Sequence, residues 1–201
     1  MKHDLISRYR QAAEKYSGLE AKEEKHLLYL SAARFLSFTG GLVLIWFVFS
    51  VSRIAAYFLI PSVIILFTYL LKKYSEHTGK KEFLGNLAKI NNDEAKAIAG
   101  DYSCFEPGNE YINGDHEFSF DIDLFGKSSL FQYINRTVTG YGSDILASWL
   151  SDPFKLADRL ISRQDAIQEL AGKEEWRHSF LASGMKTPLE KTQIRSLLEW
   201  L

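Results

Sequence analysis

Two consecutive apolar segments constrain this chain more than any other feature. Residues 35–52 and residues 54–71 contain no charged side chain, and Arg53 alone separates them. A helix of that length rises about 27 Å, close to the roughly 30 Å hydrocarbon core of a bilayer. A core helix of a soluble protein would show a polar face, and these segments show none. We therefore expect a transmembrane helical hairpin over 34–73; the alternative is a hairpin buried inside a large soluble domain.

The charges beside the hairpin predict its orientation. Basic residues flank it on both sides, namely Lys22, Lys25, Arg34, Lys72, Lys73, Lys80 and Lys81, whereas the connection holds only Arg53. The positive-inside rule then places both termini in the cytoplasm and the tight turn outside, which predicts an inner (cytoplasmic) membrane protein. Neither span holds an ionisable residue, and this disfavours a transporter or channel.

Helices are expected on both sides of the hairpin. Before it, apolar residues recur at spacings of four and three, namely Leu5, Tyr9, Ala12, Tyr16 and Leu19. After it, Phe83, Leu87 and Ile90 form a similar stripe that ends near Gly100. The spacing is heptad-like, so we expect the two helices to pair as a cytoplasmic stalk. Gly18 should interrupt the first helix, and Pro61 should kink the second span.

The C-terminal part reads as a set of short elements. Residues 101–114 carry several Pro, Gly and Asn breakers and predict an irregular linker. Alternating apolar and polar residues over 118–124 predict one short strand. Helices are expected over 128–136, 139–150, 156–171 and from Thr187 to Leu201, where apolar residues at the tip suggest a longer natural chain. The expected fold is therefore all-α with one short β-strand.

Four segments follow from this pattern. We expect a cytoplasmic amphipathic helix over 1–33, the transmembrane hairpin over 34–73, a stalk helix and irregular linker over 74–114, and a helical core over 115–201.

No segment carries a convincing reactive site. The 24 Lys and Arg against 25 Asp and Glu give a formal net charge of −1, which excludes a self-sufficient basic nucleic-acid binder. The sole cysteine, Cys104, excludes a disulfide framework. Gly126-Lys127-Ser128 suggests a phosphate loop, but Asp121 stands where that motif needs a glycine. The five histidines have no metal-ligand spacing, so we predict no catalytic, cofactor-binding or metal-binding residue.

The stretch 123–170 combines many specific residue types in one order. Its features are Ser129-Leu130-Phe131, Asn135-Arg136-Thr137, Thr139, Gly142, Leu146, Trp149-Leu150, Pro153, Ile161, Arg163-Gln164 and Ile167. This series resembles the core, or lever, region of the MutS family of DNA mismatch repair ATPases. The likeness covers about a quarter of the chain closely, and 118–201 loosely.

The motif residues are expected to have structural roles. Asn135 and Thr137 suit a helix end, and Thr139 can cap the next helix. Gly142 would permit close helix approach, and Leu146, Trp149 and Leu150 lie at core-facing spacing. Arg136 and Arg163 are expected to form buried ion pairs, the alternative being contact with phosphate. The site residues that the resemblance marks are Asn135, Arg136, Thr137, Thr139, Gly142, Trp149, Pro153, Arg163 and Gln164.

The whole layout resembles the membrane-anchored MutS-related proteins of bacteria. The resemblance implies two membrane helices, then the core, then a C-terminal ATPase domain that this chain lacks. No cofactor is expected in this chain, and ATP and Mg²⁺ are expected for the full-length protein. The implied partners are the lipid bilayer, DNA, a second copy in a homodimer and the ATPase domain. The alternative is a membrane-tethered scaffold that dimerises through its stalk and has no nucleic-acid role.

Overall fold

The computed structural model describes residues 2–114, 119, 122–152 and 157–186. Within these residues the chain has six α-helices, one 3-10 turn and no strand, which confirms the prediction of an all-α fold. The chain divides into two compact units, one of residues 15–85 and one that joins residues 1–14 to residues 86–201. The assignment of anchor, stalk and core segments along the sequence stays a prediction.

Two long helices make up the N-terminal half of the chain. Helix α1 runs over Lys2–Val51 and helix α2 over Arg53–Ala99, so only Ser52 interrupts them. The predicted break at Gly18 is wrong, because α1 is continuous there. A glycine inside a helix costs about 1 kcal/mol, which the packing of a long helix readily offsets. Pro61 likewise lies inside α2 without ending it.

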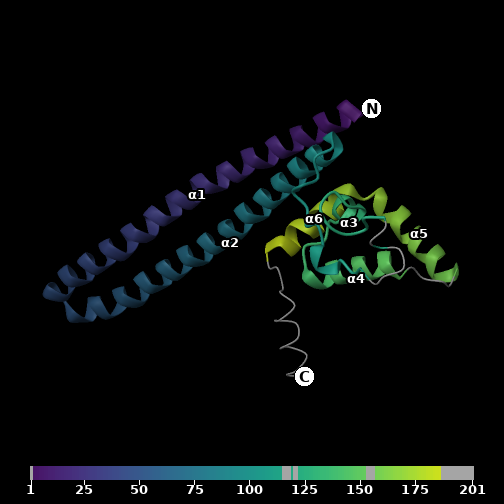
Figure 1. Cartoon of the computed structure of the whole chain (residues 1–201). Helices are drawn as coiled ribbons and strands as arrows, with labels where there is room; N and C mark the ends of the chain where they lie inside the picture. Colours follow the sequence, from purple (N-terminus) through teal and green to yellow (C-terminus); the bar gives the residue numbers. More distant parts are fainter. Residues whose placement is uncertain (1, 115–118, 120–121, 153–156, 187–201) are drawn as a thin grey trace, which may run out of the picture. The chain divides into compact units, whose positions relative to one another are not determined.

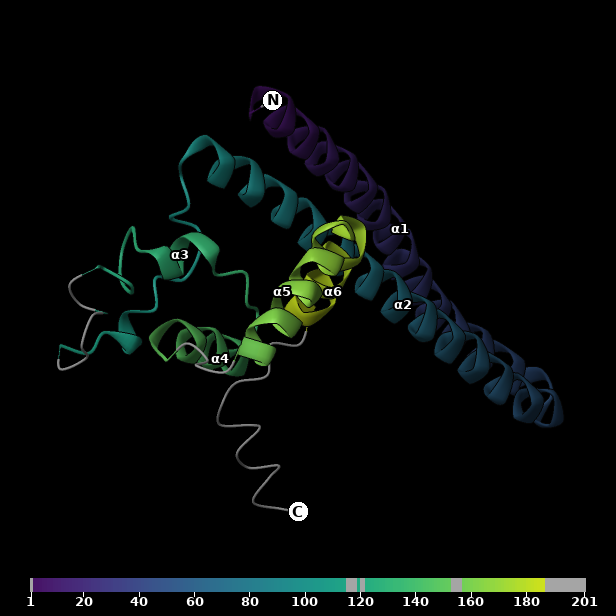
Figure 2. The same cartoon turned by 90° about the vertical axis from the view of Figure 1, so that its right-hand side faces the viewer.

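Within residues 15–85, α1 and α2 lie side by side and run antiparallel (Figures 1 and 2). Their register is set by close pairs across the hairpin. The Phe38 and Phe67 ring centroids are 5.9 Å apart, and a Cβ on Gly41 would lie 2.6 Å from Cγ1 of Val63. Gly41 therefore lets the two backbones approach closely, in keeping with the small-residue packing of apolar helices.

Further from the turn, polar contacts join the same two helices. Glu23 is buried on α1, where it pairs with Lys80 and lies 2.6 Å from Nδ1 of His77. Hydrogen bonds from Lys80 and then His77 hold the pKa of Glu23 below its ordinary value. Lys81 pairs with Glu24 at 3.3 Å. These contacts pair α1 with α2 within this unit, and the stalk built from the two apolar stripes stays a prediction.

Both α1 and α2 contain a stretch long and apolar enough to cross a membrane, judged by length and composition. Only 6% of either stretch is buried within the chain. Trp46, Phe58 and Ile65 are 69–78% exposed, so large apolar side chains point away from the hairpin. The stretches therefore do not resemble the covered core helices of a soluble domain.

Short helices follow in the second unit. They are the 3-10 turn η1 (Asn109–Tyr111) and the helices α3 (Leu130–Ile134), α4 (Gly140–Ser151), α5 (Ala157–Ala171) and α6 (Glu174–Lys186). The predicted helices over 139–150 and 156–171 match α4 and α5 closely, and the one over 128–136 is shorter than expected. Helix α6 was not predicted. The helix predicted from Thr187 lies outside the described residues.

The strand predicted over 118–124 is wrong where this segment is described. Ile122 and Asp123 form a turn, and Asp123 has a φ of 48°. The amide of Leu124 donates to the carbonyl of Ser119 at 3.0 Å, which folds the chain back on itself. A left-handed residue cannot continue an extended strand, so the alternation of apolar residues here reflects a turn with one buried side.

Candidate functional site

The motif segment Ser129–Phe131 builds the core of the second unit. Phe131 is fully buried and packs with a cluster of apolar residues, namely Leu124, Phe125, Ala147, Tyr111, Leu146 and Leu150. The hydroxyl of Ser129 caps α3 by accepting from the amide of Gln132 at 3.1 Å. Gly108 has a φ of 68°, and a Cβ there would lie 2.7 Å from the Phe131 ring. The linker before α3 is therefore fitted closely against this phenyl ring.

Asn135 closes the turn that joins α3 to α4. Its side-chain oxygen accepts from the amide of Thr137 at 3.0 Å and from the Thr137 hydroxyl at 2.7 Å. Its amide nitrogen donates to the carbonyl of Glu106 at 3.3 Å, which ties the turn to the linker. Asn135 is only 3% exposed, so every one of these bonds replaces water that the side chain has lost. The expected helix-end role of Asn135 and Thr137 is therefore what the geometry shows.

Arg136 reaches from this turn to helix α2. Its Nε and Nη2 atoms donate to Oε1 and Oε2 of Glu94 at 2.6 and 3.2 Å, a two-pronged ion pair. Its Nη1 atom donates to the carbonyls of Tyr133 and Asn135 at 2.9 and 3.1 Å. The guanidinium carbon lies 3.6 Å from the centre of the Phe105 ring. Four of its five N–H groups are thus used within the protein, which favours packing over phosphate contact.

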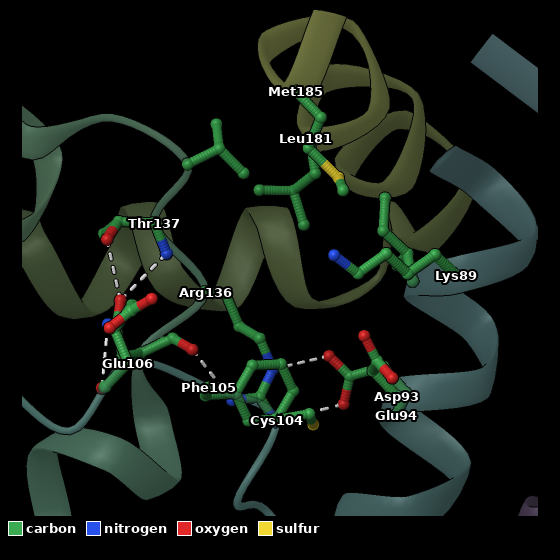
Figure 3. A pocket seen from close by; sticks show the side chains of 13 residues that line it. Lys89, Asp93, Glu94, Cys104, Phe105, Glu106, Arg136, Thr137, Leu181 and Met185 are labelled. Atoms are coloured by element: carbon green, nitrogen blue, oxygen red, sulfur yellow. Dashed lines mark hydrogen bonds and ion pairs between the residues drawn. The ribbon is translucent and has the colours of Figure 1, made fainter. Parts of the chain in front are cut away.

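A cavity of about 140 Å³ adjoins Arg136 (Figure 3). Its wall is formed by α2, the linker, the turn after α3, and α6, from which Leu181 and Met185 face inward. Cys104 lies at its edge, and burial raises the pKa of this thiol. The thiol therefore stays protonated near neutral pH and is a poor nucleophile. No group of His, Cys, Asp and Glu side chains among the described residues could hold a metal ion.

Helix α6 contributes contacts that sequence reasoning missed. The Arg8 guanidinium binds both carboxylate oxygens of Glu174, at 3.0 and 2.7 Å. The rings of Tyr9 and His178 are 6.0 Å apart. Asn86 on α2 donates to the carbonyl of Ala182 at 3.1 Å. These residues lie 90 or more positions apart in the sequence, so only the fold could reveal their pairing.

The remaining motif residues lie on α4 and α5. The Thr139 hydroxyl caps α4 by accepting from the amide of Gly142 at 3.1 Å, as expected. We expected Gly142 to let another helix approach closely, and this is wrong. A Cβ on Gly142 would instead meet the turn before α4, with the Thr139 hydroxyl at 3.1 Å. Arg163 covers the Trp149 ring at 3.8 Å, and Gln164 is exposed. Pro153 lies outside the described residues.

Two backbone amides of the segment 126–128, which resembled a phosphate loop, donate hydrogen bonds within the chain. The amide of Gly126 donates to the carbonyl of Pro107 at 2.8 Å, and the amide of Ser128 donates to Oε1 of Gln132 at 2.8 Å. Backbone amides committed in this way cannot cradle a phosphate.

Comparison with known proteins shows what part of this unit is similar to. Residues 113–195 match the family model of MutS domain III. The DNA mismatch repair protein MutS of Myxococcus xanthus is 39% identical over 51 residues, 25% of this chain and 6% of that protein. The DNA mismatch repair protein MSH3 of Phaeosphaeria nodorum is 34% identical over 93 residues, 42% of this chain and 8% of that protein.

The DNA mismatch repair protein msh3 of Aspergillus niger is 33% identical over 93 residues, which are 42% of this chain and 8% of that protein. The chain thus spans less than a tenth of the curated relatives it matches. No solved structure matches the chain.

Proposed function

With residues 113–195 related to domain III of the MutS DNA mismatch repair proteins, we propose that this chain is the anchor and core part of a membrane-bound MutS-like ATPase. In this proposal the core transmits nucleotide-driven motion between an ATPase domain of the longer protein and DNA or a protein partner. The observation that carries the proposal is the ion pair between Glu94 and Arg136, which joins a long helix to the motif segment.

Helix α2 gives the proposal its mechanical basis. It runs without interruption from Arg53 to Ala99, over 47 residues and about 70 Å. Glu94 lies near its C-terminal end and holds Arg136, which follows α3. A movement of the motif segment would therefore be passed to the helix through a bonded contact, since both side chains are more than two-thirds buried.

The membrane part rests on the surface of the hairpin. Many large apolar side chains there are exposed, and water would penalise that surface by about 25 cal/mol for each Å². A bilayer removes this penalty, and a helix also satisfies its own backbone hydrogen bonds in hydrocarbon. The single basic residue near the turn, Arg53, against seven in the flanks supports an orientation with both termini in the cytoplasm.

Two assays test the membrane part. Alkaline carbonate should leave the protein in the membrane pellet. A membrane-impermeant maleimide should label Arg53→Cys in a Cys104→Ser background in intact cells, but should reach the native Cys104 only after the membrane is opened. Release by carbonate, or equal labelling of both positions, would remove the anchor from the proposal.

DNA and nucleotide enter as partners of the longer protein. ATP and Mg²⁺ would be bound by the ATPase domain and would supply the driving free energy. The near-zero charge of this chain predicts weak DNA binding by the chain alone. Equilibrium binding of the whole chain to duplex and mismatched DNA over a salt series tests this part. Binding no tighter than that of a neutral control protein would contradict a role of this chain in DNA binding.

The genomic frame beyond codon 201 tests the nucleotide part. A phosphate-loop motif, G-x-x-x-x-G-K-[ST], a few hundred residues further on is the expected result. A stop codon directly after Leu201 would favour the scaffold alternative.

A further inference from the structure

Three basic residues lie at one end of the two apolar segments. Arg34 directly precedes the first segment, and Lys72 and Lys73 directly follow the second. The Arg34 guanidinium lies 4.7 Å from the centre of the Tyr74 ring, so the antiparallel register brings these residues to one level of the hairpin. All of them belong to the unit of residues 15–85.

Two of these cations, Arg34 and Lys72, form no ion pair within the described part of the chain. Lys73 pairs with Glu76 at 3.1 Å, which uses the acidic group nearest to this level. Arg34 forms no ion pair there, and its buried Nε atom has no hydrogen-bond partner. Lys72 is exposed and is likewise in no ion pair among the described residues. A buried N–H group without an acceptor costs free energy. An anionic oxygen of a ligand bound beside Arg34 would remove that cost.

The neighbouring side chains indicate what would bring that oxygen. Phe35 and Leu71 lie next to the charges and are 67% and 40% exposed. Tyr29 and Tyr69 are also exposed, and tyrosine is enriched where a helix meets the membrane–water boundary. A ligand here would thus have an anionic head beside an apolar tail.

We propose that Arg34 and Lys72 bind the phosphate of an anionic phospholipid in the cytoplasmic leaflet. The inference rests on the proposed membrane hairpin and adds a headgroup preference to it. A guanidinium donates two parallel N–H bonds to phosphate oxygens, and the ammonium adds a second point charge. The acyl chains of the same lipid would contact Phe35 and Leu71, which a free phosphate could not do.

The test uses the whole chain reconstituted in phosphatidylcholine vesicles. Spin-labelled phosphatidylglycerol and phosphatidylcholine are compared by the motionally restricted fraction in their electron paramagnetic resonance spectra. We expect more restriction of phosphatidylglycerol, and loss of this preference in the variant Arg34→Gln/Lys72→Gln. Each charge near an anionic surface accounts for about a fivefold change in affinity at the site.

The matched control is Lys15→Gln/Lys22→Gln, which removes the same charge from α1. These residues lie roughly 28 and 18 Å further along the helix from Arg34, beyond the roughly 8 Å Debye length. The control should keep the preference.

Equal restriction of both lipids in the wild type would overturn the headgroup site while leaving the hairpin in the bilayer. No restriction of either lipid would instead overturn the membrane proposal. Loss of the preference on adding inorganic phosphate, but not chloride of equal ionic strength, would show a soluble phosphate site instead.

Discussion

The Nε atom of Arg136 lies 2.6 Å from Oε1 of Glu94, a residue 42 positions earlier in the chain. The two side chains are 28% and 20% exposed, so water screens the ion pair only partly. This contact joins the end of a long helix to the turn between α3 and α4.

Removing either charge should destabilise the second unit. Arg136→Gln and Glu94→Gln each leave a charge that is more than two-thirds buried without its partner, so we expect a loss of about 1 to 3 kcal/mol in the free energy of unfolding. Arg136→Lys should recover little, because lysine cannot make the two-pronged pair or the same stacking on Phe105. Thermal unfolding in mild detergent measures all three. A double variant with a strictly additive loss would contradict a direct interaction.

Thr139 tests the structural interpretation of the motif. Thr139→Ala removes the cap of α4, and we expect a loss of about 1 kcal/mol. Thr139→Ser keeps the hydroxyl and should retain most of the stability. Chemical denaturation followed by circular dichroism compares the two. If both variants lost equal stability, the methyl group and not the cap would be responsible.

Gly40 and Gly41 form a matched pair in the hairpin. A Cβ on Gly41 would lie 2.6 Å from Cγ1 of Val63, whereas a Cβ on Gly40 meets nothing within 4 Å. Gly41→Ala should push the helices apart and cost about 1 to 3 kcal/mol. Gly40→Ala should be neutral or slightly stabilising, since alanine favours helix. Unfolding by added sodium dodecyl sulfate in micelles measures both, and equal effects would contradict the close approach.

His178 should make stability depend on pH. Burial lowers its pKa in the folded state; Glu174 and Glu94 oppose this shift, and Arg177 and Arg8 add to it. The unfolded chain therefore takes up a proton first, near its ordinary pKa of about 6.5. Stability should be full above about pH 7, fall as the pH drops through 6.5, and level off once the folded imidazole is protonated.

Thermal unfolding between pH 5 and pH 8 measures this slope. His178→Gln should flatten it, and the exposed His3→Gln serves as control. An unchanged slope in His178→Gln would assign the pH dependence to other groups.

The sequence predicted those elements whose signals are local. Thr139 and Asp152 bracket α4 within a residue of the expected ends, because capping chemistry depends on near neighbours. The two apolar segments were also predictable from the charge distribution, but the chain turns at Ser52 and not at the expected Arg53, which begins α2. Gly18 misled the prediction, since packing along a long helix outweighs the propensity of one residue.

Long-range partners could not be predicted in the same way. Nothing near Arg136 in the sequence points to Glu94 or Phe105, and the buried Glu23 reads as one more charge in a solvated cluster. Helix α6 was missed because its polar and apolar residues show no clear periodicity, and its position depends on Arg8 and Asn86. The strand failed at Asp123, whose left-handed conformation is not encoded by alternation.

The buried Glu23 also sets an order of events during synthesis. His77, which accompanies Lys80 around its carboxylate, is made 54 residues later. At 5 to 20 residues per second, this interval is roughly 3 to 11 s. During that time the N-terminal half of α1 exists without the part of α2 that pairs with Glu23. The contacts that bury the Glu23 carboxylate between the two helices therefore cannot form before both apolar segments have been translated.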